Sequence, residues 1–85
     1  MSEQELENII AGFFKDADIQ ATDLKGTGDH WMVRIVSAEF EGKSKIEQHR
    51  MVMTPLEERF QSNEIHAMML KTFTPEKWAK KKDQQ

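Results

Sequence analysis

The sequence contains no cysteine among its 85 residues. A chain without thiols cannot form a disulfide, use a cysteine nucleophile or build a cysteine-rich metal site by itself. No apolar run approaches the ~20 residues that a membrane-spanning helix needs. The acidic, polar segment 1–7 is also unlike a signal peptide. We therefore expect a cytoplasmic protein with no membrane association.

A surplus of positive charge is missing as well, because the formal net charge is −3. Proteins that bind nucleic acid usually carry a basic surplus, since phosphate contacts need lysine and arginine. The positive charge is instead local and concentrated near the C-terminus, at Lys77, Lys80, Lys81 and Lys82. This cluster is either a solvated last helical turn that complements the helix dipole or a phosphate-binding surface. The acidic remainder of the chain favours the first interpretation.

The length limits the class of protein further. It allows one domain, over residues 1–85, with a modest core and no deep cleft between domains. No Ser-His-Asp or Cys-His arrangement is present. The sequence therefore favours a binding protein over a free-standing enzyme.

An amphipathic helix is the clearest predicted element. Ser2 and Glu5 form the two ends of a capping box. The apolar residues that follow recur with the 3.6-residue period of a single helical stripe: Leu6, Ile9, Ile10, Phe13 and Phe14. The pattern predicts a helix that ends near residues 15–16.

A hairpin is predicted next. Residues 18–25 have mixed strand character, and residues 30–38 alternate strongly, with Trp31 and its second neighbours on one face. The glycine-rich segment 26–29 between them is typical of a turn, because glycine adopts positive φ at little cost.

A helical segment that contains a proline follows the hairpin. Ser44 begins a pattern whose expected face holds Ile46, His49, Arg50, Met53, Leu56 and Phe60. Pro55 interrupts it, because proline removes a helical hydrogen bond. Thr54-Pro55-x-Glu57 is also a typical helix start. We expect one short helix over 44–53 and a restarted or kinked helix over 54–61.

The remaining elements complete an α-β-β-α-β-α order. A third strand is predicted over 65–73, and Thr74-Pro75-Glu76 begins a last helix that carries Trp78. This order predicts an α+β fold, with a three-stranded mixed sheet and helices packed on one face. A helix of ~15–18 residues between the second and third strands is typical of a crossover to a parallel neighbour.

This topology predicts that two histidines lie close together at one edge of the sheet. His30 begins the second strand and His66 the third. Parallel strands start at the same edge of a sheet and lie ~4.8 Å apart, so both imidazoles can reach one metal atom. Imidazole nitrogens suit Fe, Zn or Cu.

Two ligands alone do not complete a zinc site, which normally has three or four. Either Asp29 and Glu64 add oxygen ligands, or a partner completes the site. The competing interpretation is that each histidine is an ordinary hydrogen-bonded surface residue. His49, on the predicted helix, is interpreted as a packing or solvent-facing residue.

Several segments together resemble the BolA family, and its short bacterial YrbA or IbaG branch in particular. The resemblance runs from about Leu6 to Trp78. It is carried by Gly26-Thr27-Gly28-Asp29-His30-Trp31, Phe40-Glu41-Gly42-Lys43-Ser44, His49-Arg50-Met51-Val52, Ile65-His66-Ala67-Met68 and Lys71-Thr72-Phe73-Thr74-Pro75-Glu76-Lys77-Trp78.

This resemblance implies a fold like a type II KH domain and a monothiol glutaredoxin as partner. In such complexes the two proteins share a [2Fe–2S] cluster, and the glutaredoxin supplies a cysteine and glutathione. The BolA side supplies the histidine of the I-H-A motif, here His66, and a loop Cys or His, here His30. No cofactor is expected when the chain is alone, and whether the free chain forms a homodimer is left open.

The resemblance also implies an alternative, a DNA-binding regulator of the stress response. Its candidate phosphate contacts are Lys43, Lys45, Arg50, Lys71, Lys80 and Lys81, with the other C-terminal lysines. A KH domain clamps nucleotides with a Gly-x-x-Gly loop between helices, and the sequence contains no such loop. The acidic net charge also counts against this alternative.

Overall fold

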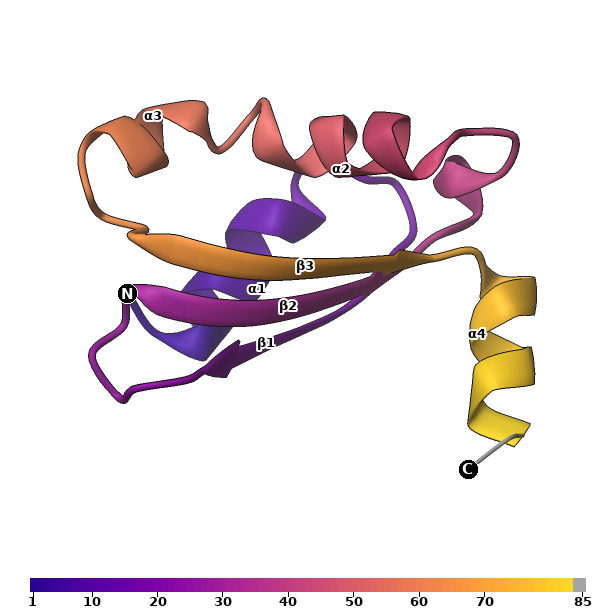
Figure 1. The fold of residues 1–85 in the computed structure, drawn as a ribbon, viewed down its shortest axis with the longest axis horizontal. Helices are drawn as coiled ribbons and strands as arrows, with labels where there is room; N and C mark the ends of the chain where they lie inside the picture. Colours follow the sequence, from indigo (N-terminus) through magenta and orange to yellow (C-terminus); the bar gives the residue numbers. More distant parts are fainter. Residues whose placement is uncertain (84–85) are drawn as a thin grey trace.

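The computed structural model describes residues 1–83, without the side chains of residues 82 and 83. Lys82, one of the lysines in the predicted C-terminal cluster, therefore has a side chain outside the described part. The elements follow the predicted order, with one added 3-10 turn (Figure 1): α1 (Glu3–Ala11), β1 (Asp18–Asp23), β2 (His30–Val36), η1 (Ala38–Phe40), α2 (Lys45–Met53), α3 (Glu57–Gln61), β3 (Ala67–Phe73) and α4 (Pro75–Asp83).

The sheet has the strand order β1-β2-β3. β1 pairs with β2 in the antiparallel sense, and β2 pairs with β3 in the parallel sense. In the parallel pair, His30 lies opposite Ala67. The predicted hairpin and helical crossover are therefore both confirmed, and β2 is the central strand.

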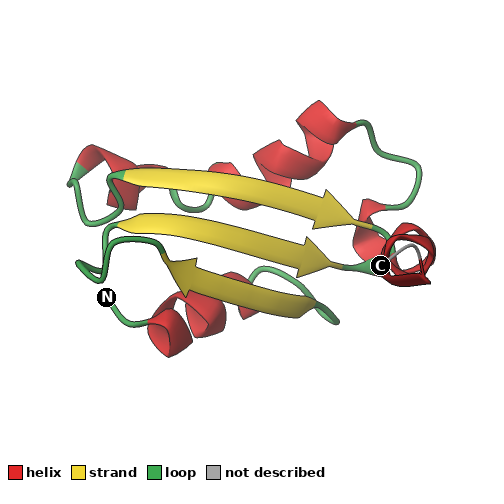
Figure 2. Ribbon diagram, turned by 60° about the horizontal axis from the view of Figure 1, so that its bottom comes forward, coloured by secondary structure: helices red, strands yellow, loops and turns green. Residues whose placement is uncertain are grey.

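Helices cover one face of this sheet. α1, α2 and α3 lie behind the strands in Figure 2, whereas the face toward the viewer is open. α4 lies beyond the ends of β2 and β3, at the edge of the sheet (Figure 1). The predicted α+β fold is confirmed, and within residues 1–83 no helix is long and apolar enough to cross a membrane.

The core forms between the sheet and the three helices. β2 contributes alternate side chains, because successive residues of a strand point to opposite faces. Trp31, Val33 and Ile35 are fully buried, whereas Met32 and Arg34 lie on the open face. The other buried apolar residues of this core cluster are Leu6, Ile10, Ala21, Phe40, Val52, Leu56 and Ile65.

Helix α1 begins as predicted and ends earlier. The capping box of Ser2 and Glu5 is formed in both directions. The helix nevertheless stops at Ala11, before Gly12. Phe13 and Phe14 still pack against the core from the loop. The apolar pattern of the sequence thus extends past the end of the helix, because Phe13 and Phe14 contact the core from the loop.

The segment around Pro55 breaks the helix as predicted, but the expected cap is wrong. Thr54 is the C-cap of α2, and α3 begins after Leu56 with no side-chain cap. Leu56 is fully buried. The restart is therefore positioned by burial of Leu56 in the core rather than by a Thr-Pro start.

The predicted inner face of α2 is also wrong. Ile46 is 66% exposed, whereas Gln48 and Val52 are buried. The Gln48 side-chain amide donates to the carbonyls of Phe40 (3.2 Å) and Lys43 (2.9 Å). Its oxygen accepts a hydrogen bond from the buried Thr72 hydroxyl (2.6 Å). A polar residue therefore occupies a core position because its partners are polar groups that burial would otherwise leave unpaired.

We predict that Gln48→Leu lowers the free energy of unfolding by about 2–4 kcal/mol, because buried acceptors and the Thr72 hydroxyl lose their partner. Urea denaturation measures the change. The matched control is Gln61→Leu on exposed α3, for which we expect less than about 0.5 kcal/mol. Equal effects of the two substitutions would contradict a structural role for Gln48.

Candidate metal site at the start of the parallel strands

The two predicted histidines lie together at one end of the sheet. The ring centroids of His30 and His66 are 5.0 Å apart, and the ring planes are tilted by 44°. His30 is the first residue of β2, and His66 immediately precedes β3, which begins two residues later than predicted. The strand order places both imidazoles at the edge where the parallel strands start (Figure 1).

The backbone of Asp29 holds the two strand starts together. Its carbonyl oxygen accepts hydrogen bonds from the amides of His66 (2.8 Å) and Ala67 (3.1 Å). The residue before β2 is thereby joined to the first residues of the β3 segment. These two hydrogen bonds place the backbone of His66 beside the start of β2, where His30 lies.

The hairpin loop that carries His30 is ordered by one carboxylate. Asp23 accepts hydrogen bonds from the amides of Gly26 (2.8 Å) and Gly28 (3.0 Å). Both glycines have positive φ, 73° and 76°, a conformation that other residues adopt at a cost. The indole N–H of Trp31 donates to the Gly28 carbonyl (3.2 Å) and ties the loop to the core. These hydrogen bonds therefore hold the loop, and the His30 that follows it, in one conformation.

The Asp29 carboxylate orients the ring of His30. One of its oxygens lies 2.8 Å from Nδ1 of His30. When Nδ1 carries the proton, this carboxylate accepts a hydrogen bond from Nδ1–H, and Nε2 keeps a free lone pair. Histidines that bind metals usually make such a hydrogen bond through the other ring nitrogen. Asp29 is therefore placed as a positioning residue rather than as the oxygen ligand considered from sequence.

The pKa of Asp29 is lowered from its ordinary value of 3.8. The hydrogen bond from the Thr27 hydroxyl is the main cause, followed by the hydrogen bond with His30. Both imidazoles lower the pKa further through their charge when they are protonated. The carboxylate beside His30 therefore stays ionised at neutral pH.

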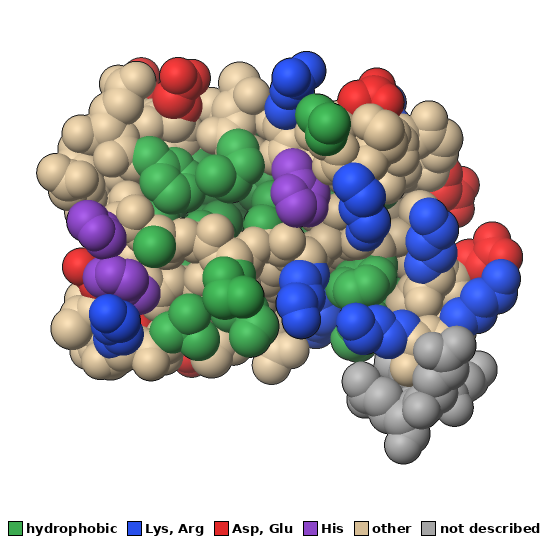
Figure 3. All heavy atoms as spheres, in the orientation of Figure 1, with side chains coloured by type: hydrophobic (Ala, Val, Ile, Leu, Met, Phe, Trp, Pro, Cys, Tyr) green, Lys and Arg blue, Asp and Glu red, His purple; other side chains and the backbone are tan. Residues whose placement is uncertain are grey.

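The histidine pair is not part of a larger ligand cluster. Among the described side chains, which run through residue 81, no group of three from His, Cys, Asp or Glu is placed to hold a metal ion. Glu64, considered as a ligand from sequence, is therefore not gathered with the two histidines. Figure 3 shows two histidine side chains next to each other at one end of the molecule and a third apart from them. His49 lies on α2. The two histidines therefore supply two ligands, which is half of a four-ligand metal site.

The residues predicted to contact phosphate do not form one continuous group in the structure. Lys43 and Arg50 are exposed, and Lys80 pairs with Glu76 at 3.3 Å. Lys45 and Lys81 both lie over the ring of Phe73, with ammonium-to-centroid distances of 5.2 and 5.0 Å. Most Lys and Arg side chains on the face shown in Figure 3 lie away from the two neighbouring histidines, in the half of the molecule that contains α4. Nucleic-acid binding by these residues stays a prediction.

Sequence reasoning missed Arg34 at this basic end. Its guanidinium lies 4.4 Å from the ring centroid of Trp78 and 3.2 Å from the Asp18 carboxylate. The alternation of β2 placed Arg34 on the open face, which was the available signal. The contact with Trp78 required the position of α4, which the alternation does not specify.

These features define a small α+β domain that presents two imidazoles from neighbouring parallel strands. The chain belongs to the BolA-like family, because residues 6–77 match the family model for BolA-like proteins.

Individual relatives agree with this assignment. The acid stress protein IbaG of Escherichia coli is 30% identical over 80 residues, covering 94% of this chain and 92% of IbaG. The solution structure of yeast Fra2 is 36% identical, with a TM-score of 0.74 over 94% of this chain and 86% of Fra2. A bol-like protein from Babesia bovis is 26% identical, with a TM-score of 0.79 over 96% and 94% of the two chains. The similarity to IbaG agrees with the predicted short bacterial branch.

We predict that Thr27→Val raises the pKa of Asp29 toward its ordinary value, because the hydrogen bond that lowers this pKa most is lost. A carbon-detected NMR titration of the Asp29 carboxyl measures this change, and Thr22→Val on β1 is the control. The folded pKa is the lower one, so the associated stability is present above the unfolded pKa and is lost as pH falls through the folded pKa. An unchanged pKa in Thr27→Val would assign the shift to another group.

Proposed function

We propose that this chain is an adaptor, not an enzyme, that contributes His30 and His66 to a [2Fe–2S] cluster shared with a monothiol glutaredoxin. The partner supplies a cysteine and glutathione on its side of the cluster. The adaptor acts in iron–sulfur cluster trafficking or in iron and stress regulation. The observation that carries this proposal is the close pair of imidazoles, 5.0 Å apart, in a chain with no cysteine.

The ligand chemistry supports a shared site. Iron–sulfur clusters are ordinarily held by thiolates, and two histidines replace two of them in Rieske centres. This chain has imidazoles and no thiolate, so a cluster at this edge needs ligands from a second molecule. A cysteine and a glutathione thiolate on the partner would complete four ligands with His30 and His66.

The surroundings of the pair support rigid presentation of the ligands. The Asp23 carboxylate orders the loop, and the Asp29 carboxylate orients His30 through Nδ1. A ligand held in its binding geometry loses less conformational entropy when the partner arrives. The His66 side chain is exposed at this edge, so a partner can approach the pair from solvent.

The family context supports a role in stress physiology. The relative in Escherichia coli carries the name acid stress protein. We infer for this chain a cytoplasmic role in a related response, exerted through delivery or sensing of the shared cluster. The cluster is then the cargo of the adaptor rather than a resident group of the free chain.

The test is to mix the purified chain anaerobically with a cluster-loaded monothiol glutaredoxin and to record visible circular dichroism. We expect His66→Ala and His30→Ala to abolish or shift the bands of the complex and to accelerate cluster loss. His49→Ala is the matched control, because it removes the third histidine of the chain, which lies on α2. We expect the control to match the parent chain.

An intermediate result is expected for Asp29→Asn, because loss of a residue that orients a metal ligand typically costs about 10–100-fold in metal affinity. Far-UV circular dichroism of each variant shows whether the fold is kept. If folded His66→Ala and His30→Ala give the same spectrum and cluster lifetime as His49→Ala, the proposed function is wrong.

A further inference from the structure

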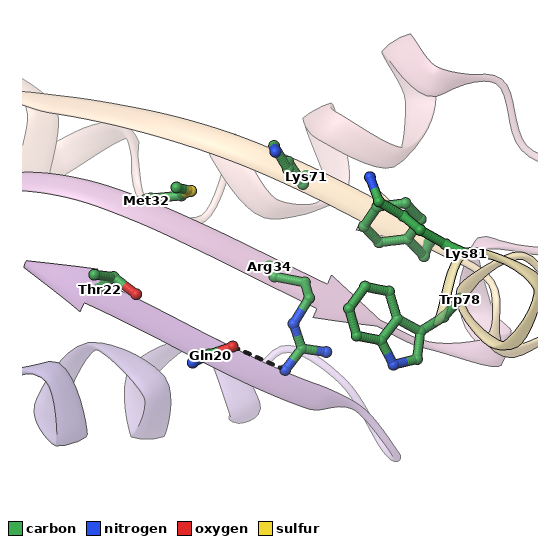
Figure 4. Close-up of a pocket in the computed structure, with 8 residues that line it drawn as sticks. Gln20, Thr22, Met32, Arg34, Lys71, Trp78 and Lys81 are labelled. Atoms are coloured by element: carbon green, nitrogen blue, oxygen red, sulfur yellow. Dashed lines mark hydrogen bonds between the residues drawn. The ribbon is translucent and has the colours of Figure 1, made fainter. Parts of the chain in front are cut away.

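The open face of the sheet contains a cavity of about 290 Å³ toward its α4 end (Figure 4). β1, β2 and β3 all contribute lining residues, and α4 closes one end with the side chains of Trp78 and Lys81. The cavity begins at Met32, two residues along β2 from His30, and extends away from the histidine edge. The proposed function uses none of the side chains that line it.

The described charged side chains of this cavity are all positive. They are those of Arg34, Lys71 and Lys81, and the described lining contains no Asp or Glu. Arg34 is oriented by the Asp18 carboxylate at 3.2 Å and the Gln20 amide oxygen at 3.3 Å (Figure 4). Among the described side chains, neither Lys71 nor Lys81 takes part in an ion pair. The described part of the cavity therefore presents two ammonium groups beside a guanidinium that its own hydrogen bonds hold in place.

The positive field extends beyond the cavity wall. The pKa of Lys45 is lowered, first by burial and then by the charges of Lys77 and Lys81. Lys45 also donates a hydrogen bond to the Thr72 carbonyl, which keeps its ammonium near Phe73. Like charges that crowd together cost free energy unless an anion lies between them. This end of the sheet is therefore complementary to a negatively charged ligand.

The apolar part of the lining is aromatic. The rings of Phe73 and Trp78 are 5.2 Å apart and tilted by 48°. Arg34 lies over the ring of Trp78 at 4.4 Å from the centroid, and Met32 extends the apolar floor. Aromatic and guanidinium planes of this kind stack on flat heterocycles. The lining therefore suits a ligand that joins a planar ring to an anionic group.

The size of the cavity selects a small ligand. A volume of about 290 Å³ is at the lower limit of ordinary ligand sites. The amide of Gln20 and the hydroxyl of Thr22 provide hydrogen-bonding groups at its edge. We propose that the cavity binds a free nucleoside monophosphate, with the base against Phe73 and Trp78 and the phosphate between Lys71 and Lys81.

The two tryptophans of this chain allow a direct test. Only Trp78 lines the cavity, whereas Trp31 is fully buried and donates its indole N–H to Gly28 near the histidine edge. In ¹H–¹⁵N NMR spectra, titration with AMP is expected to shift the Trp78 indole signal saturably and to leave that of Trp31 in place. Adenosine, which lacks the phosphate, and inorganic phosphate, which lacks the ring, are expected to bind at least about tenfold more weakly.

Single-lysine variants test the placement of the phosphate. We expect Lys71→Ala to weaken AMP binding by about tenfold, because one charge-assisted contact is lost. Lys80→Ala is the matched control, because it removes the same charge from a lysine that is exposed and paired with Glu76. Both substitutions are at exposed positions, so the fold is expected to be kept.

Four outcomes of the AMP titrations and lysine variants would overturn the proposal. These are no saturable shift of Trp78 at millimolar AMP, equal shifts of both indoles, inorganic phosphate binding as tightly as AMP, or equal weakening by the two lysine variants. The proposal would also be wrong if a short single-stranded oligonucleotide bound more than about tenfold tighter than AMP and Lys71→Ala abolished that binding. That result would assign the surface to a nucleic-acid strand instead of a free nucleotide. His66→Ala leaves the cavity intact, so failure of the cluster experiment and failure of this one are distinguishable.

Discussion

The carbonyl oxygen of Asp29 makes the contact on which the arrangement of this molecule depends. It accepts hydrogen bonds from the amides of His66 and Ala67 and so joins the start of β3 to the start of β2. These residues are more than thirty positions apart in sequence, with the crossover helices α2 and α3 between them. The same residue orients the His30 ring through its carboxylate. Asp29 therefore both joins the starts of the parallel strands and orients one of the two imidazoles.

The sheet separates two chemistries by placing them at opposite ends. Its inner face is occupied by the core, so its outer face and its edges are available for binding (Figure 2). The histidine pair lies where β2 and β3 begin, whereas the aromatic and cationic cavity lies toward their ends. Alternation along β2 separates the two faces of the sheet, because Trp31 faces the core while Met32 and Arg34 lie on the open face.

Much of the fold could be predicted because the relevant signals are local. The capping box of Ser2, the glycine turn before His30 and the break at Pro55 all depend on near neighbours in sequence. The wrong predictions concern residues whose burial or capping depends on contacts with residues distant in sequence. Gln48 is buried because carbonyls of the preceding loop and the Thr72 hydroxyl of β3 satisfy it, and no helical period reports those partners. The cap predicted at Thr54 failed for a related reason, since burial of Leu56 positions α3.

By itself, the sequence determined the order of elements, the strand starts at which both histidines lie and the lack of any thiol to accompany them. These properties follow from residue identity and short-range periodicity. Only the tertiary structure decided that the imidazoles lie 5.0 Å apart, that Asp29 positions one of them and that Arg34 meets Trp78. Each of these contacts joins residues whose distance depends on how separate elements pack. Packing is a property of the whole chain, so local sequence patterns do not specify it.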